Sequence, residues 1–183
     1  AIDAMRERYT LPIIGMEPAV KPAVAATKTG VVGVLATSGT LKSAQFAALL
    51  EHYGQGVEVV TQACVGLVEC VERGELTSPS TQALLKQYLQ PLLDANADTI
   101  VLGCTHYPFV RPLIKDLVGK DVVLIDTGAA VANHLKNRLK ENQLLRASDE
   151  LGTVEFWSNS EAVDAGVVVS ALWGAKVNLA CLS

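Results

Sequence analysis

The sequence lacks several features that would place it in a particular class of protein. No apolar run is long enough to cross a membrane, and no basic run offsets the net charge of −4, so nothing indicates a membrane or a nucleic-acid partner. The four cysteines, Cys64, Cys70, Cys104 and Cys181, have spacings that fit no common zinc pattern and suggest no disulfide framework. Reduced thiols and a cytoplasmic location are the simplest expectation.

The pattern of apolar residues predicts an α/β fold. Half of the 183 residues are apolar and 19% are charged, as in globular proteins. Short apolar runs alternate with amphipathic segments, which favours a mostly parallel sheet flanked by helices. Strands are expected at residues 31–36, 57–61, 99–103 and 122–125, with weaker signals at 11–15 and 152–158. Helices are expected at residues 1–8, 41–53, 65–73, 81–97 (with a kink or broken turn at Pro91), 109–118, 129–140 and 161–173.

The most informative stretch is residues 99–108, Thr-Ile-Val-Leu-Gly-Cys-Thr-His-Tyr-Pro. An apolar, partly β-branched run is followed by small and polar residues and then by Pro108, which suits a first helical turn. Cys104 would therefore lie at the carboxyl end of a strand and just before a helix, where open α/β sheets bind ligands. A helix N-terminus and the nearby His106 both favour a reactive thiolate, so Cys104 is a candidate base or nucleophile.

Each candidate also has an ordinary structural interpretation. A cysteine that follows an apolar strand is most often a small buried hydrophobe. The turn at residues 37–40, Thr-Ser-Gly-Thr, can cap a helix or direct backbone N–H groups at a ligand carboxylate. Glu72 can be a solvated carboxylate at a helix end or can support a histidine across a cleft. Cys64 and Cys70 are interpreted as packing residues.

Several strings, in order along the chain, resemble the glutamate racemases of the aspartate/glutamate racemase family. The most specific is Gly-Cys-Thr-His-Tyr-Pro at residues 103–108, which is similar to the second catalytic-cysteine motif of that family. The Glu-Pro-Ala-Val-Lys-Pro-Ala string at 17–23, Ala-Thr-Ser-Gly-Thr at 36–40, the segment around Glu72 and Asp-Thr-Gly at 126–128 are also similar. Val65 departs from the pattern, because family members often have proline there.

The resemblance implies a reaction and roles for individual residues. In this family two cysteines on opposite faces of the α-carbon interconvert L- and D-glutamate without a cofactor, supplying D-glutamate for peptidoglycan. Cys104 would be the second of these cysteines, the one that acts on L-glutamate, and His106 would assist its proton traffic. Thr105, with Thr37 and Thr40, would contact the substrate, and Glu72 would support His106. A homodimer is compatible with the resemblance, since such racemases are often dimers.

The sequence departs from the family in one respect that bears on activity. The Asp-Ser-Gly loop and the Cys-Asn-Thr-Ala motif with the first catalytic cysteine do not occur in it. The resemblance therefore implies that these 183 residues are a fragment that is inactive alone. It also implies three parts: a remnant of a first domain at 1–18, a continuous second domain at 19–126, and a return to the first domain at 127–183.

Two functions from other classes remain open. A Cys–His hydrolase would use Cys104 as nucleophile and His106 as base. It needs an orienting third group and an oxyanion hole, and two residues this close on one loop are expected to point apart. A non-catalytic amino-acid-binding or regulatory module would bind glutamate weakly without turnover. An aspartate racemase fits less well, because the His-Tyr-Pro continuation points to the glutamate branch.

Overall fold

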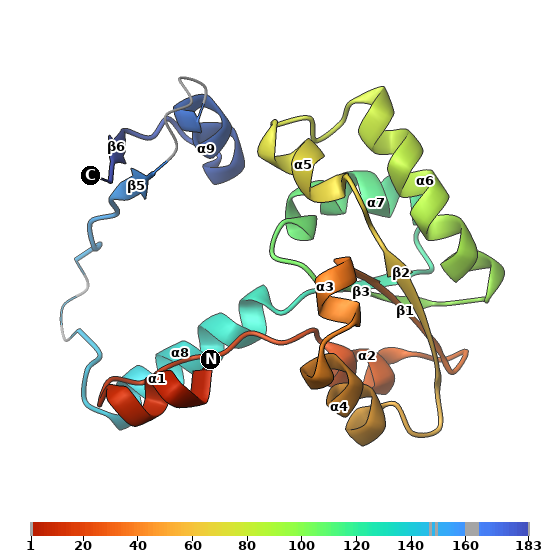
Figure 1. Cartoon of the computed structure of the whole chain (residues 1–183), viewed down its shortest axis with the longest axis horizontal. Helices are drawn as coiled ribbons and strands as arrows, with labels where there is room; N and C mark the ends of the chain where they lie inside the picture. Colours follow the sequence, from red (N-terminus) through yellow and green to blue (C-terminus); the bar gives the residue numbers. More distant parts are fainter. Residues whose placement is uncertain (1, 147, 149, 160–164, 183) are drawn as a thin grey trace.

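The fold is centred on a four-stranded parallel sheet (Figure 1). The computed structural model describes residues 2–146, 148, 150–159 and 165–182. The strands are β1 (Val31–Ala36), β2 (Glu58–Ala63), β3 (Thr99–Leu102) and β4 (Val123–Ile125), in the order β2-β1-β3-β4. All four residues of β3 and five of the six in β1 are buried, as expected for inner parallel strands.

Helices cover both faces of this sheet. On one face, α5 (Leu67–Glu72), α6 (Pro79–Asp94), the 3₁₀ helix η1 (Tyr107–Val110) and α7 (Arg111–Val118) bury a core with Leu67, Leu89 and Ile114. On the other face, α2 (Val20–Ala26) and α4 (Ala44–Tyr53) enclose a smaller core around Val20 and Phe46. The short helix α3 (Ser38–Leu41) connects β1 to α4. The predicted α/β class is therefore confirmed.

The remaining elements lie outside these layers. Helices α1 (Ile2–Arg8) and α8 (Gly128–Glu141) run side by side away from the sheet, and β5 (Phe156–Ser158) and β6 (Leu179–Cys181) form a separate two-stranded parallel sheet beside α9 (Ala165–Trp173) (Figure 1). None of the described residues of α1, α8 and α9 is fully buried. α9 contacts the central unit through Leu172, which packs on the larger core.

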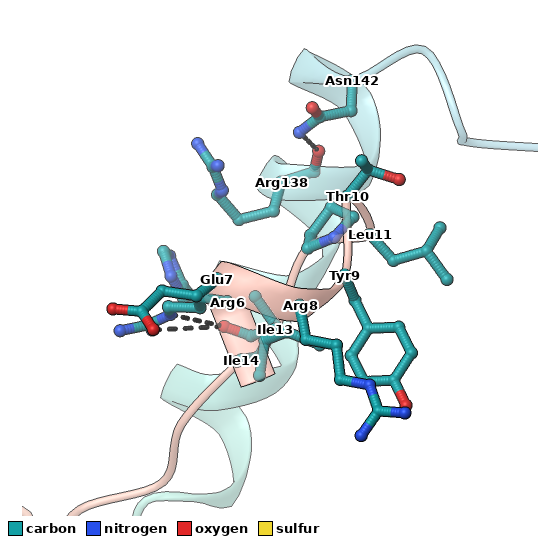
Figure 2. A pocket seen from close by; sticks show the side chains of 12 residues that line it. Arg6, Glu7, Arg8, Tyr9, Thr10, Leu11, Ile13, Ile14, Arg138 and Asn142 are labelled. Atoms are coloured by element: carbon teal, nitrogen blue, oxygen red, sulfur yellow. Dashed lines mark hydrogen bonds between the residues drawn. The ribbon is translucent and has the colours of Figure 1, made fainter. Parts of the chain in front are cut away.

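A cavity of about 680 Å³ lies between residues 6–14 and α8 (Figure 2). Its lining includes Arg6, Arg8, His134 and Arg138. The Arg6 guanidinium donates to the Ile13 carbonyl at 3.2 Å, which fixes the chain as it leaves α1. Arg8 and Arg138 point away from each other, so the cationic groups do not converge on one point (Figure 2). His134 lies on α8 as predicted and is part of this surface.

The structure differs from the sequence prediction at several elements. Residues 11–15 form no strand, because no described strand lies beside them, and residues 20–26 form a helix that was not among the expected elements. The predicted helix 41–53 begins at Ala44, since residues 38–41 form their own short helix and Ser43 caps the next.

Three further differences concern later parts of the chain. Helix α6 continues through Pro91 without a broken turn, β6 was not predicted, and residues 161–164 of the predicted last helix lie outside the described residues. Among the described residues, no helix combines the length and apolar character needed to cross a membrane.

The amino edge of the sheet is held together by Asp98, which precedes β3. Its carboxylate accepts hydrogen bonds from the Thr27 hydroxyl (2.6 Å), the Lys28 and Thr29 backbone N–H groups (2.7 and 3.0 Å) and the Thr99 hydroxyl (3.2 Å). Partial burial raises the pKa of Asp98, but these hydrogen bonds outweigh it and hold the pKa at about 2. The carboxylate therefore connects the loop before β1 to the loop before β3.

Replacing Asp98 by asparagine is expected to destabilise the central unit by about 1–3 kcal/mol, because an amide cannot accept all of these bonds. The pKa of Asp98 is lower in the folded chain than the value of about 3.9 in an unfolded one. Its contribution is therefore fully present above about pH 4 and is lost as the pH falls toward 2. Urea unfolding between pH 2 and 7 should show this loss in the wild type and a weaker one in Asp98→Asn; identical pH profiles would contradict the assignment.

Candidate active site

The strand order predicts a crevice at the carboxyl edge of the sheet. The chain leaves β1 toward α4 on one face and leaves β3 toward η1 and α7 on the other. β1 and β3 are neighbours, so the loops that follow them diverge at a topological switch point, where open α/β sheets bind ligands. Residues 37–40 follow β1 and residues 103–106 follow β3, so both predicted strings border this point.

Gly103 permits a close approach between the two strands at their carboxyl ends. Its N–H donates to the Leu35 carbonyl at 2.8 Å. A Cβ at this position would lie 2.9 Å from that carbonyl oxygen and 3.3 Å from the Ala36 Cβ. The glycine is thus needed for the contact that places Cys104 beside the end of β1.

Cys104, His106 and Glu72 form a connected set. The Cys104 Sγ lies 3.8 Å from Nδ1 of His106, and Nε2 of the same ring lies 3.2 Å from Oε1 of Glu72. The Thr105 hydroxyl is 3.5 Å from Nδ1. The two side chains of the second contact are 32% and 63% exposed, so water weakens this contact. The expectation that Cys104 and His106 point apart was wrong, because the turn after β3 brings the two groups together.

The turn at residues 37–40 forms the opposite border of the crevice. The Thr37 side chain accepts the Thr40 N–H at 3.2 Å, and the two hydroxyls are 2.9 Å apart. This is the capping arrangement that the sequence allowed. Both threonines are partly exposed.

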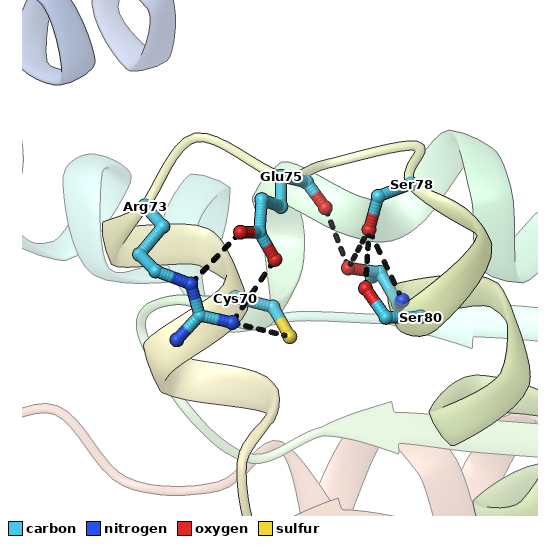
Figure 3. Close-up of polar contacts among 6 residues, drawn as sticks. Cys70, Arg73, Glu75, Ser78 and Ser80 are labelled. Carbon is cyan, nitrogen blue, oxygen red and sulfur yellow. Dashed lines mark hydrogen bonds and ion pairs between the residues drawn. The ribbon is translucent and has the colours of Figure 1, made fainter.

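Glu72 is the last residue of α5, and the connection that follows it is firmly bonded (Figure 3). Arg73 donates to both carboxylate oxygens of Glu75 at 2.9 and 3.0 Å and contacts the buried Cys70 sulfur at 3.6 Å. The Glu75 carbonyl accepts the Thr81 hydroxyl at 2.6 Å, and Ser78 caps α6. The Arg73 hydrogen bonds lower the pKa of Glu75. This network fixes the end of α5 that carries Glu72.

Two groups behind Cys104 were not anticipated as parts of the site. Cys64 follows β2 and is 3% exposed, and burial raises the pKa of its thiol to about 12. Tyr107 is fully buried, and its hydroxyl has no hydrogen bond of good geometry to any described residue. Cys64 occupies the same strand-end position after β2 as Cys104 does after β3, which was the available signal. Cys70 is buried packing, as predicted.

The set can transfer a proton at one face of a small ligand. A partly exposed thiol next to an imidazole, which is bonded to a carboxylate, has the composition of an acid/base group. Cys64 remains a neutral thiol near neutral pH and so supplies no second base. No group of three or more potential metal ligands occurs within the described part of the chain.

Comparison with known proteins gives consistent matches. Residues 1–135 match the family model described as Asp/Glu/Hydantoin racemase. The chain is 53% identical over 174 residues to a glutamate racemase of Pseudomonas putida, covering 94% of this chain and 65% of that protein. The chain therefore spans somewhat less than two thirds of the length of that relative.

Two solved structures have the same fold. One is Escherichia coli glutamate racemase in complex with L-glutamate and the activator UDP-MurNAc-Ala (TM-score 0.82, 26% identity, 100% of this chain and 69% of that one). The other is the Francisella tularensis enzyme in complex with D-glutamate (TM-score 0.81, 26% identity, 100% of this chain and 68% of that one).

The open parallel sheet with a thiol–imidazole pair at its switch point defines an α/β protein equipped for acid/base chemistry. With residues 1–135 matched, the chain belongs to the Asp/Glu/Hydantoin racemase family.

Gly103→Ala is expected to lower the free energy of unfolding by about 1–3 kcal/mol, because the new methyl group would meet backbone atoms of β1 that cannot move freely. Urea unfolding should show this loss, while Gly152→Ala, at a position with nothing within 4 Å, should leave stability unchanged. Equal stability of the two variants would show that the contact with Leu35 is not required.

Proposed function

We propose that the chain carries one half of a glutamate racemase site, which interconverts L- and D-glutamate by thiol proton transfer without a cofactor. The observation that carries the proposal is the 3.8 Å contact between Cys104 and His106 at the end of β3, within a chain 53% identical to a glutamate racemase. D-Glutamate made in this way would supply peptidoglycan synthesis.

In the proposed reaction, the Cys104 thiolate removes the α-proton of L-glutamate and becomes a thiol. In the reverse direction the thiol returns that proton to the same face of the carbanion. His106 accepts a proton from the Cys104 thiol before the reaction and so generates the thiolate, and Glu72 stabilises the resulting imidazolium through its 3.2 Å contact. Inversion requires a second acid/base group on the other face of the α-carbon, and none of the other three cysteines borders the crevice as an exposed thiol.

The substrate carboxylates would be held at the two borders of the crevice. Thr37 and Thr40 offer hydroxyls and the N-terminus of α3 on one side, and Thr105 offers its hydroxyl beside Cys104 on the other. Hydroxyl and backbone N–H donors suit carboxylates. The two solved relatives were determined in complex with L-glutamate and with D-glutamate, which supports a small amino acid as ligand.

We also propose that residues 19–126 form the continuous domain and that residues 1–18 and 127–183 belong to a second unit. A segment similar to the part of the relatives that the chain does not match, about a third of their length, would complete this second unit. Most of the exposed large apolar side chains of the described residues lie outside residues 19–126. The exceptions are Val65, Phe109 and Val123. Trp157, Val167 and Trp173 are 55%, 69% and 57% exposed. A two-stranded parallel sheet such as β5–β6 is normally covered on both faces and extended at its edges.

A Cys–His hydrolase is the second candidate, and one observation favours it. Glu72 supplies the orienting third group that such a hydrolase needs, so Cys104, His106 and Glu72 have the order of a nucleophile–base–carboxylate triad. A burst of product from an activated ester, with a covalent adduct on Cys104, would support this function. A module that binds glutamate without turnover is the remaining alternative, and α-proton exchange separates it from the racemase.

A first test of this proposal is α-proton exchange in D₂O, followed by NMR. The 183-residue polypeptide should exchange the α-proton of L-glutamate without inverting it and should leave D-glutamate unchanged, because only one face has a base. Cys104→Ser should reduce the exchange by at least about 100-fold, since general acid/base catalysis typically contributes that much. Exchange that survives in Cys104→Ser, or no exchange in the wild type, would contradict the proposal.

A second test of the proposal uses the part of the relatives that the chain does not match. A polypeptide made from the part of the Pseudomonas putida relative that the chain does not match should bind the 183-residue chain one to one, reduce its aggregation and restore racemisation. Light scattering and optical rotation measure these effects, with Cys104→Ser as the inactive control. Two results together would argue against the domain assignment. The chain would be monomeric and unfold in one cooperative transition that includes α9, and it would not bind the added segment.

A further inference from the structure

An ion pair between Arg111 and Asp126 lies where the chain leaves the central sheet for α8. Nη1 of Arg111 donates to Oδ2 of Asp126 at 2.7 Å, and Nη2 donates to the Leu124 carbonyl at 2.8 Å. Oδ1 of Asp126 accepts the N–H of Gly128, the first residue of α8, at 3.0 Å. One guanidinium therefore holds the end of β4, and the carboxylate that it binds holds the start of α8.

Arg111 is also connected to the turn that carries Cys104. The Tyr107 N–H donates to the Cys104 carbonyl at 3.2 Å. The Phe109 N–H donates to the His106 carbonyl at the same distance, so the turn continues directly into η1. Arg111 follows η1 as the first residue of α7. A bonded path thus runs from the candidate base, through η1 and Arg111, to the start of α8.

Helix α8 has few other contacts that could fix its direction relative to the sheet. None of its residues is buried, and it runs away from the sheet (Figure 1). Its first turns face residues 15–22 and α4 across a cavity of about 290 Å³. The Arg111 and Asp126 side chains are 43% and 25% exposed, so their pairing adds little to overall stability. The pair can still fix a direction, because a planar guanidinium donates from two nitrogens in a set geometry.

We propose that Arg111 and Asp126 form a joint that fixes the direction in which α8 leaves the central sheet, relative to the turn that carries Cys104. The inference rests on the proposed function and its division into domains, in which α8 belongs to the unit that would complete the site. The joint would then align Cys104 with the acid/base group on the other face of the α-carbon. Arg111 is a positioning residue in this account and needs no contact with the substrate.

Lys115 provides a matched control on the same helix. It lies one turn after Arg111 and also bonds to the chain around β4, through the Val122 carbonyl at 2.6 Å and the Lys120 carbonyl at 3.2 Å. These two carbonyls precede β4, whereas Arg111 bonds at the carboxyl end of that strand. The two cations therefore differ in which end of β4 they hold, and of the two it is Arg111 that is bonded to the residue capping α8.

The experiment measures the distance between two nitroxide labels in the 183-residue chain by pulsed electron paramagnetic resonance. Gln87→Cys places one label on an exposed position of α6, and Asn137→Cys places the other on an exposed position of α8. Cys104→Ser and Cys181→Ser remove the two accessible thiols and leave two buried cysteines that the label does not reach. The measured distances then report the direction of α8 relative to the helices that cover the sheet.

With the joint intact, the distances should form one narrow distribution. Arg111→Gln should widen this distribution at least about twofold, because an unbraced passage between two units absorbs changes in backbone angle. Asp126→Asn should widen it as well, and the double variant should add nothing further, as expected for two residues that act as one pair. Lys115→Gln should leave the width as in the wild type.

The alignment of the two faces is tested by racemisation in the mixture of the chain with the added segment of the relative. Arg111→Gln should lower kcat for L-glutamate by about 10- to 100-fold, because small misplacements of reacting groups cost that much. KM should stay nearly unchanged, since the turn that carries Cys104 is intact, and Lys115→Gln should retain the wild-type kcat. A wild-type kcat in an Arg111→Gln chain with widened distances would overturn the alignment.

Two distance results would overturn the joint itself. One is an unchanged width in both Arg111→Gln and Asp126→Asn, each checked for folding by circular dichroism. The other is an equal widening in Lys115→Gln, which would indicate general loosening around β4. The distances are measured without glutamate and without the Cys104 thiol, so they can contradict the joint while α-proton exchange succeeds. Conversely, a wild-type chain that exchanges no α-proton would reject the proposed function, and the distances would still decide whether the joint exists.

Discussion

The pairing of β3 with β1 is the constraint on which the candidate site depends. These two strands are neighbours in the sheet but are separated in sequence by β2 and by the four helices α3 to α6. Their following loops leave toward opposite faces, so the backbone itself opens a crevice between them. The lack of a side chain at Gly103 lets the ends of the strands approach closely, and every group proposed to act on a ligand is attached within a few residues of this contact or faces it from α5.

Much of the central unit could be predicted because inner parallel strands are apolar along their whole length. Residues 31–36 form a strand with the predicted bounds, and 99–103 were predicted to within one residue. The elements that were missed have weak local signals. Helix α2 contains Pro22 in its first turn, where proline is tolerated although prolines in a sequence more often indicate a loop. Strand β6 is only three residues long.

The candidate site divides in the same way into local and distant contacts. Cys104 and His106 are two residues apart, so one motif places both after the same strand, although their contact depends on the turn between them. Glu72 lies 34 residues before His106, and only the resemblance pointed to it. Tyr107 and Cys64 follow different strands, yet they belong to one buried core cluster. No periodicity in the sequence reports that they share it.

The hydrogen bonds of Asp98 have a consequence for how this fold can change. They join the loops before β1 and β3 at the amino edge of the sheet, whereas Cys104, Thr37 and Cys64 all follow strands at the carboxyl edge. Acid-sensitive stability and the groups proposed to act on a ligand thus lie at opposite ends of the same strands. Substitutions that change the stability of the fold can accumulate at the amino edge without altering the residues proposed to contact a ligand. Stability and ligand preference can therefore change independently in proteins with this arrangement.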